Sequence, residues 1–347
     1  MKRRRIILCC ALAAAAFSAA GQARGQEGGG AREWLKNRAS RKAAQRSSPG
    51  DGAAPAIAAK INSPGDYTLT VEHGGAARKY RIHVPEGYTG KKPAPLLMAF
   101  HGGGGNSAFM ANDKYYGLPS KADKEGFVAV FPDGASRLRG KLATWNAGDC
   151  CGYARDSRSD DVGFVDKILK DLRGRLNLDA GRTYAAGMSN GGMFVYRLAC
   201  DLPGVFRAIA SVTGTDNYSG CAQPRPVPVL HIHAENDTHI LFGGGAGPDA
   251  FRDQSKVTDF TSVTGTIEKW LKRNGCKGSP ERVVKKDGVY CDLYRDCKDG
   301  ALVKLCVTSS GGHSWPGAKA KPTKRSDSPS SAISATDEIW DFFSGLP

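Results

Sequence analysis

The chain has 347 residues, of which 40% are hydrophobic and 24% are charged. This is the composition of an ordinary globular protein, and the length is sufficient for one large hydrophobic core. The formal net charge is +15, but no nucleic-acid-binding motif accompanies it, so nucleic acid is not an expected partner.

The N-terminus has the features of a secretory signal peptide. Lys2–Arg5 form a basic start, an apolar run covers Ile6–Ala16, and small residues follow as far as Ala23. The apolar run is too short for a membrane-spanning helix, which needs about 20 residues, so no stable membrane span is expected. We predict a signal peptide over residues 1–23 and a secreted or periplasmic protein. An uncleaved anchor is the alternative.

Residues 24–64 are rich in Gly, Ala, Ser, Pro and Arg, which predicts a flexible basic linker. A solvated tail is the favoured interpretation, and contact with anionic envelope polymers or lipids is the alternative. Residues 65–347 are expected to form one folded domain, because no internal repeat or second domain is evident.

The domain begins with two alternating segments, Tyr67–Val71 and Lys79–Val84, separated by His73-Gly74-Gly75, which predicts an antiparallel hairpin. Short continuous apolar runs then predict buried parallel strands, and helical patterns lie between several of them. The predicted strands are 95–100, 127–132, 182–187, 205–212 and 227–233, and the main predicted helices are 160–176, 191–200 and 261–274. The expected fold is of the α/β class, with a mostly parallel sheet, an antiparallel N-terminal hairpin and helices on both faces.

The segment Gly187–Gly192 contains Gly-x-Ser-x-Gly between a predicted strand and a helix. A tight turn at this place exposes the serine hydroxyl at the top of a sheet, and the flanking glycines leave room for the strained backbone. We predict Ser189 as a nucleophile. A glycine-rich turn with a capping serine is the alternative.

A second glycine-rich loop, His101–Asn106, follows the strand that ends at Phe100. Such loops present backbone N–H groups to a developing oxyanion. We predict Gly103 and Asn190 as the two donors. A phosphate-binding loop is disfavoured, because the lysine and hydroxyl residue of such a loop are absent.

The nucleophile needs a base and an orienting acid, which in this fold follow the serine in the order acid, then histidine. Asp237 is the predicted acid, with Glu235 as the alternative. His313 is the predicted base, with His239 as the alternative. His231 and His233 alternate along a strand and are expected to be structural.

Two tryptophans, Trp145 and Trp315, lie near these motifs and are candidates for the lining of a substrate pocket, with a place in the core as the alternative. No metal site and no cofactor are expected.

Eight cysteines remain after the leader, which in an exported chain indicates disulfide bonds. A zinc site is disfavoured, because no Cys-x-x-Cys pair occurs. Segments 288–293 and 301–307 predict a hairpin about Lys298-Asp299, whose register places Cys291 opposite Cys306. We therefore predict Cys291–Cys306 and Cys276–Cys297 bonds. Adjacent Cys150 and Cys151 would bond either to each other or to separate partners.

Together these segments resemble the secreted esterases of the polyhydroxybutyrate depolymerase-like family, which includes feruloyl and acetylxylan esterases. The resemblance is carried by His101–Asn106, Trp145–Gly152, Asp160–Phe164, Gly187–Cys200, His231–Asp237 and Gly311–Gly317. It implies an α/β-hydrolase fold, the triad Ser189, Asp237 and His313, and no cofactor. Ala234 departs from an expected glycine. Met188 and Ser314 stand where the tannase-like subgroup has cysteines, which disfavours that subgroup.

The expected function is secreted hydrolysis of carboxylic esters in small or polymeric substrates, such as hydroxybutyrate oligomers or feruloyl and acetyl esters. The alternatives are a peptidase or thioesterase that uses the same triad, and a non-catalytic binding protein of the cell envelope. The oligomeric state is left open.

Overall fold

The computed structural model describes residues 59–138, 140–221, 225–250, 258–320 and 327–347. Every described residue belongs to one compact unit. The predicted signal peptide and residues 24–58 of the predicted linker lie outside the described residues. Ile61 is buried, and its N–H donates to the carbonyl of Arg175 at 2.9 Å, so the contacts of this unit begin before the first strand.

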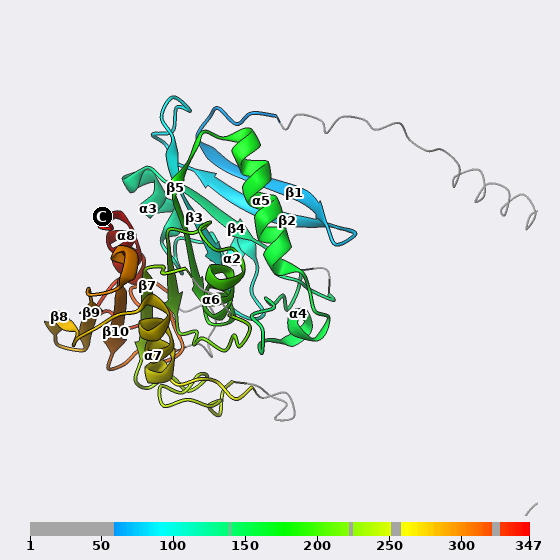
Figure 1. Ribbon diagram of the computed structural model, residues 1–347. Helices are drawn as coiled ribbons and strands as arrows, with labels where there is room; N and C mark the ends of the chain where they lie inside the picture. Colours follow the sequence, from blue (N-terminus) through cyan, green and yellow to red (C-terminus); the bar gives the residue numbers. More distant parts are fainter. Residues whose placement is uncertain (1–58, 139, 222–224, 251–257, 321–326) are drawn as a thin grey trace, which may run out of the picture. The chain divides into compact units, whose positions relative to one another are not determined.

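Among the described residues, ten strands form one sheet in the order β1-β2-β4-β3-β5-β6-β7-β10-β9-β8 (Figure 1). The five central pairings, from β4–β3 to β7–β10, are parallel, and the two ends of the sheet are antiparallel. The expected α/β-hydrolase architecture with an N-terminal hairpin is confirmed. The strands are β1 (Gly65–His73), β2 (Ala76–Val84), β3 (Ala94–Phe100), β4 (Val128–Pro132), β5 (Leu178–Met188), β6 (Ala208–Val212), β7 (Val229–Ala234), β8 (Glu281–Lys286), β9 (Val289–Tyr294) and β10 (Val303–Thr308).

Helices cover both faces of the sheet (Figure 1). One hydrophobic cluster contains residues of α5 (Asp161–Arg175), α6 (Asn190–Asp201) and α7 (Val263–Asn274). The other contains residues of α2 (Ser107–Met110), α3 (Leu118–Glu125) and α8 (Ala335–Ser344), while the short α4 (Gly152–Asp156) lies in a loop. In the described part of the chain, no helix has the length and apolar character needed to cross a membrane.

Sequence patterns predict α5, α6 and α7 but not α3 or α8. In α3, Leu118 and Ala122 are the buried apolar residues, which is too few to produce a recognisable helical period. Tertiary packing therefore selects this helix.

The C-terminal strands have the expected register, with Cys291 opposite Cys306. The connection differs from the tight turn expected at Lys298-Asp299, because the ladder ends at Tyr294 and Val303 and a 3₁₀ turn, Lys298–Gly300, lies between them. The structure also adds an unpredicted edge strand, β8, whose pairing with β9 shifts register between Arg282 and Val284.

Four disulfides are present among the described residues. Cys291–Cys306 and Cys276–Cys297 are the two pairs that the hairpin register predicts. Cys150 and Cys151 bond to each other, and Cys200 bonds to Cys221.

Candidate active site

Ser189 lies in a sharp turn between β5 and α6, at the carboxyl end of the central strands. Its φ of 54° is in the left-handed region, which a residue other than glycine rarely adopts. Its N–H donates to the carbonyl of Val212 on the neighbouring strand at 2.8 Å, and its carbonyl accepts from the N–H of Met193 at 2.8 Å. These two bonds fix the strained turn to both the sheet and the helix.

The glycines around Ser189 are required by close backbone contacts. A side chain at Gly187 would collide with the backbone of Gly191, and one at Gly191 would collide with the carbonyl oxygens of Phe100 and His101. The helix therefore begins directly against the end of β3. This explains why the motif needs glycine on both sides of the nucleophile position.

Three side chains from separate segments join in a hydrogen-bonded row. His313 Nε2 lies 2.8 Å from Ser189 Oγ, and His313 Nδ1 lies 2.8 Å from Asp237 Oδ2. Because a carboxylate can only accept, Nδ1 carries the proton and Nε2 is left to accept from the Ser189 hydroxyl in the neutral ring. The arrangement can activate a serine hydroxyl and hold the resulting imidazolium.

Asp237 is almost completely buried, yet its carboxylate stays ionised. Burial by itself raises the pKa of Asp237, but the adjoining His313 and the hydrogen bonds from His233 and His313 outweigh burial and hold this pKa far below its usual range. The N–H groups of His239 and Ile240 also donate to Oδ1, at 2.8 Å and 3.0 Å. The charge opposite His313 is therefore well supported.

The structure separates the predicted acid and base from their alternatives. Glu235 is exposed and has no described contact with His313. His239 does not bond to Ser189 among the described contacts but stacks on His313, with ring centroids 4.5 Å apart and an angle of 18° between the planes. Burial, together with the charge of His313, lowers the pKa of His239.

The glycine-rich loop after β3 reaches the nucleophile. A Cβ at Gly102 would lie 3.4 Å from Ser189 Cβ, and one at Gly103 would lie 3.8 Å from Asn190 Cβ. The N–H groups of Gly103 and Asn190 have no partner among the bonds of the described residues, as expected of Asn190 at the first position of α6. Two free donors beside Ser189 suit the stabilisation of an oxyanion.

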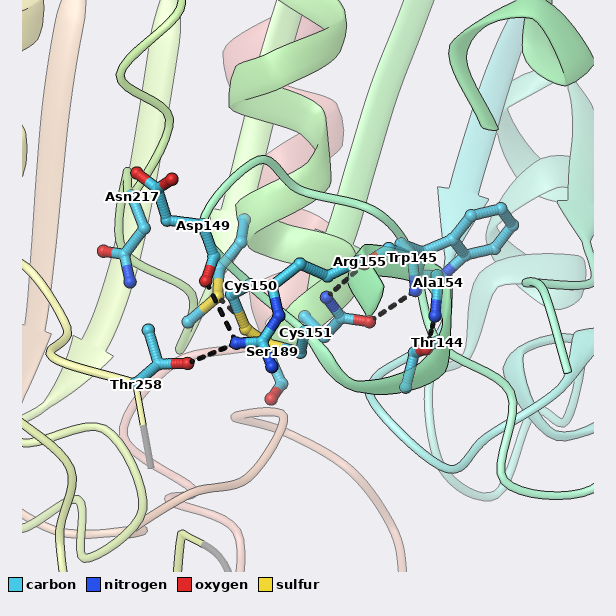
Figure 2. The surroundings of a disulfide bond; sticks show 12 residues. Thr144, Trp145, Asp149, Cys150, Cys151, Ala154, Arg155, Ser189, Asn217 and Thr258 are labelled. Carbon is cyan, nitrogen blue, oxygen red and sulfur yellow. Dashed lines mark hydrogen bonds between the residues drawn. A yellow bond between two sulfur atoms is a disulfide. The ribbon is translucent and has the colours of Figure 1, made fainter. Parts of the chain in front are cut away.

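The side chain of Asn190 holds the neighbouring loop in place. Its Oδ1 accepts from the N–H of Trp145 at 2.7 Å, and its Nδ2 donates to the carbonyl of Trp145 at 2.9 Å. The same carbonyl accepts from the N–H of Cys151 at 3.3 Å. Figure 2 shows the Cys150–Cys151 disulfide close to Ser189, with Arg155 bonded to the Asp149 carbonyl at 3.4 Å.

Both candidate pocket tryptophans lie in the hydrophobic core, which corrects the pocket interpretation. Trp145 has no exposed surface, stacks on Phe194 and donates from Nε1 to the carbonyl of His101 at 3.0 Å. Trp315 is 3% exposed and donates to Thr336 Oγ1 at 3.0 Å. Indole N–H groups with internal partners and buried rings support the loops rather than a substrate.

Two residues that hold the His313 loop in place, Asn236 and Asp327, were not predicted from the sequence. The N–H of His313 donates to Asp327 Oδ2 at 2.7 Å, and the N–H of Gly312 donates to Asn236 Oδ1 at 2.9 Å. Asp327 follows His313 by 14 residues without a motif, so only the fold reveals its role. Asn236 adjoins the predicted acid, but its loop position gave no signal of this contact.

Two described groups have ligand atoms close enough to share a metal ion: Asp237 with His239 and His313, and Cys291 with Cys306 and Glu338. In the first group both nitrogens of His313 already face Asp237 and Ser189. In the second group the two cysteines are joined in a disulfide.

Comparison with known families gives a match to "Esterase PHB depolymerase" over residues 78–222. This range contains Ser189 and the His101 loop but ends before Asp237 and His313. Feruloyl esterase B of Piromyces equi is 31% identical over 241 residues, which are 68% of this chain and 42% of the length of that protein. Putative esterase NocK of Nocardia uniformis subsp. tsuyamanensis is 28% identical over 270 residues, which are 73% of this chain and 75% of NocK.

Among solved structures, an acetyl xylan esterase from Aspergillus awamori superimposes with a TM-score of 0.52 over 80% of this chain and 99% of that one. The sequence identity is 12%, so this similarity supports the fold alone.

Proposed function

The chain belongs to the Esterase PHB depolymerase family, and on that premise we propose that it is a secreted carboxylic ester hydrolase with Ser189 as nucleophile, His313 as base and Asp237 as acid. The observation that carries the proposal is the hydrogen-bonded row from Asp237 through His313 to Ser189, with 2.8 Å at each step. A neutral His313 that accepts from the Ser189 hydroxyl is the state required for attack on an ester carbonyl.

In the proposed reaction, His313 Nε2 takes the proton of Ser189 as Oγ attacks the carbonyl carbon. The N–H groups of Gly103 and Asn190 stabilise the oxyanion, and Asp237 stabilises the imidazolium. His313 then gives its proton to the leaving alcohol, and the acyl group remains on Ser189. A water molecule releases the acid by the same steps, with His313 again as base.

The proposed substrates are esters of polymers or plant material. The family name and the feruloyl esterase relative support hydroxybutyrate oligomers and feruloyl or acetyl esters as the first compounds to test. Four disulfides support an exported protein, as does the proposed signal peptide over residues 1–23. A basic linker over 24–64 ahead of a catalytic domain over 65–347 remains the proposal, with the correction that Ile61 already packs into the domain.

A panel of methyl ferulate, acetylated xylo-oligosaccharide and hydroxybutyrate trimer tests the proposal, with a matched amide and thioester of the best acyl group. We expect ester hydrolysis to exceed amide and thioester hydrolysis, and Ser189→Ala to abolish it. Faster cleavage of the amide or thioester would instead favour a peptidase or thioesterase. No turnover and no labelling by a fluorophosphonate would favour a binding protein. Sequencing the N-terminus of exported protein tests the proposed cleavage near Ala23.

A further inference from the structure

A line of buried polar side chains leads from α6 to the far side of Asp237. Tyr196 Oη lies 2.7 Å from His231 Nδ1, and His231 Nε2 lies 3.2 Å from His233 Nδ1. His233 Nε2 lies 2.9 Å from the carbonyl of Ile240 and 3.2 Å from Asp237 Oδ2. Tyr196, His231 and His233 have no exposed surface, and Asp237 is 2% exposed. The proposed reaction uses none of the first three.

The hydrogen bonds of this line have one consistent direction. Both neighbours of His233 Nε2 are acceptors, a carbonyl and a carboxylate, so Nε2 carries the proton. In a neutral ring His233 Nδ1 must then accept from His231 Nε2–H. His231 Nδ1 accepts in turn from the Tyr196 hydroxyl. Each group donates toward Asp237, and every ring nitrogen of His231 and His233 has a hydrogen-bond partner.

The burial of the line favours neutral groups. Desolvation lowers the pKa of His231 far below its usual value, and the neighbouring His233 lowers it further. Desolvation raises the pKa of Tyr196 well above its usual value. Asp216 and Arg273, whose charges act on Tyr196, form an ion pair with each other. Burial therefore favours the neutral forms of Tyr196 and His231.

We infer that Tyr196, His231 and His233 are positioning residues, which hold Asp237 ionised and aimed at His313 through a hydrogen bond from His233 to Oδ2, the oxygen that His313 also contacts. This rests on the proposed function, because it assigns a role to residues behind the proposed acid. The carboxylate oxygen Oδ2 is shared between His233 and His313, while the backbone N–H groups of His239 and Ile240 occupy Oδ1. Because donors contact both of its oxygens, the carboxylate is held against rotation when His313 becomes charged.

Loss of the His233 donor should affect the reaction in two ways. Asp237 would be held less firmly, so kcat should fall. The negative charge of Asp237 would also be shared with fewer donors, so Asp237 would stabilise the imidazolium of His313 more strongly. The acid limb of kcat/KM would therefore move to higher pH. The other titratable groups beside this pair are His239, which stacks on His313, and Asp327, which accepts from the His313 N–H, while Asp249 acts on His239; all three are unchanged.

The test compares His233→Leu with His233→Gln, in which the glutamine amide can still donate at about the reach of Nε2. We expect His233→Leu to lower kcat by about 10-fold, as for the loss of one hydrogen bond to a charged group, and to raise the midpoint of the acid limb. His233→Gln should restore most of both values. Tyr196→Phe should shift the limb in the same direction by less. His83→Leu is the matched control, because His83 bonds to Asp66 and Asp123 away from the site.

A purely structural role would lower the melting temperature of His233→Leu but leave its acid limb at the wild-type position, and this result would overturn the inference. Equal kcat and equal limbs for the leucine and glutamine variants would also overturn it. Failure of the proposed function is distinguishable, since wild-type protein would then neither hydrolyse esters nor react with fluorophosphonate at Ser189.

Discussion

The two sides of the candidate site are held by different kinds of interaction. On the serine side, Ser189 lies in a strained turn that is pressed between β3 and α6, and contacts at Gly187 and Gly191 leave no room for movement. On the histidine side, His313 lies in a loop that is held by hydrogen bonds from Gly312 and His313 to Asn236 and Asp327.

The strand that precedes the histidine loop is braced by covalent bonds. The Cys291–Cys306 disulfide joins β9 to β10, and Cys276–Cys297 joins the end of α7 to the loop after β9. The comparison teaches that steric exclusion positions Ser189, whereas polar contacts and cross-links position His313. Substitutions on the serine side should therefore lower activity strongly, and many substitutions on the histidine side should lower it by intermediate amounts.

The largest effect is expected for Ser189→Ala, which removes the attacking oxygen. Ester hydrolysis should fall by at least about 10³-fold, while the circular dichroism and melting temperature stay close to wild type. After treatment of wild-type protein with a fluorophosphonate, peptide mass mapping should place the adduct on Ser189. Retention of more than a few per cent of turnover would remove this residue from the mechanism.

The next effect separates the two stacked imidazoles. His313→Ala should lose about 10³-fold or more of kcat/KM, because no other described side chain bonds to Ser189 Oγ. His239→Ala removes a stacked ring and should cost less than about 10-fold, measured with the same ester. The reverse ranking would transfer the role of base to His239.

On the serine side, Gly191→Ala tests steric positioning without touching a reacting group. The added methyl would collide with the carbonyl oxygens of Phe100 and His101, so we expect a loss of about 1–3 kcal/mol in unfolding free energy and a large loss of kcat. Gly243→Ala is the control, because a Cβ there meets no atom within 4 Å. Wild-type activity in Gly191→Ala would show that the turn tolerates movement.

The pH profile gives a milder test of the histidine side. A His313 that carries protons on both nitrogens cannot accept from Ser189, so kcat/KM should fall along one acid limb as the pH is lowered. The pKa of Asp237 is lowered, so this carboxylate stays ionised along that limb and should not add a second acid step. A profile with two protonation steps between pH 4 and about 7 would contradict a single titrating base.

The smallest effect on turnover is expected from the C-terminal cross-links. The double variant Cys291→Ala/Cys306→Ala should lose about 2–4 kcal/mol of unfolding free energy, and its kcat should change less than that of Gly191→Ala. Non-reducing peptide mapping of exported wild-type protein should recover Cys291 with Cys306 and Cys276 with Cys297. A link from either pair to Cys200 or Cys221 would contradict this arrangement.

Local patterns predict the parts of the molecule that depend on neighbouring residues. The Ser189 turn, the parallel strands and the Cys291–Cys306 register all follow from short segments with strict geometric needs. Asp327, the exposed β8 and the buried line behind Asp237 depend on contacts between distant segments, and a single sequence does not reveal them. For Trp145 the sequence leaves a pocket position and a core position open, and packing against Phe194 places it in the core.

The edge strand β8 also affects how the protein behaves at high concentration. An edge strand presents unpaired backbone groups to which another molecule could add a strand. In β8 the exposed positions carry Glu281, Arg282, Lys285 and Lys286, and the irregular pairing after Arg282 distorts the edge. Charge repulsion and a distorted backbone oppose strand addition between copies, so this end of the sheet should not become a site of aggregation at high protein concentration.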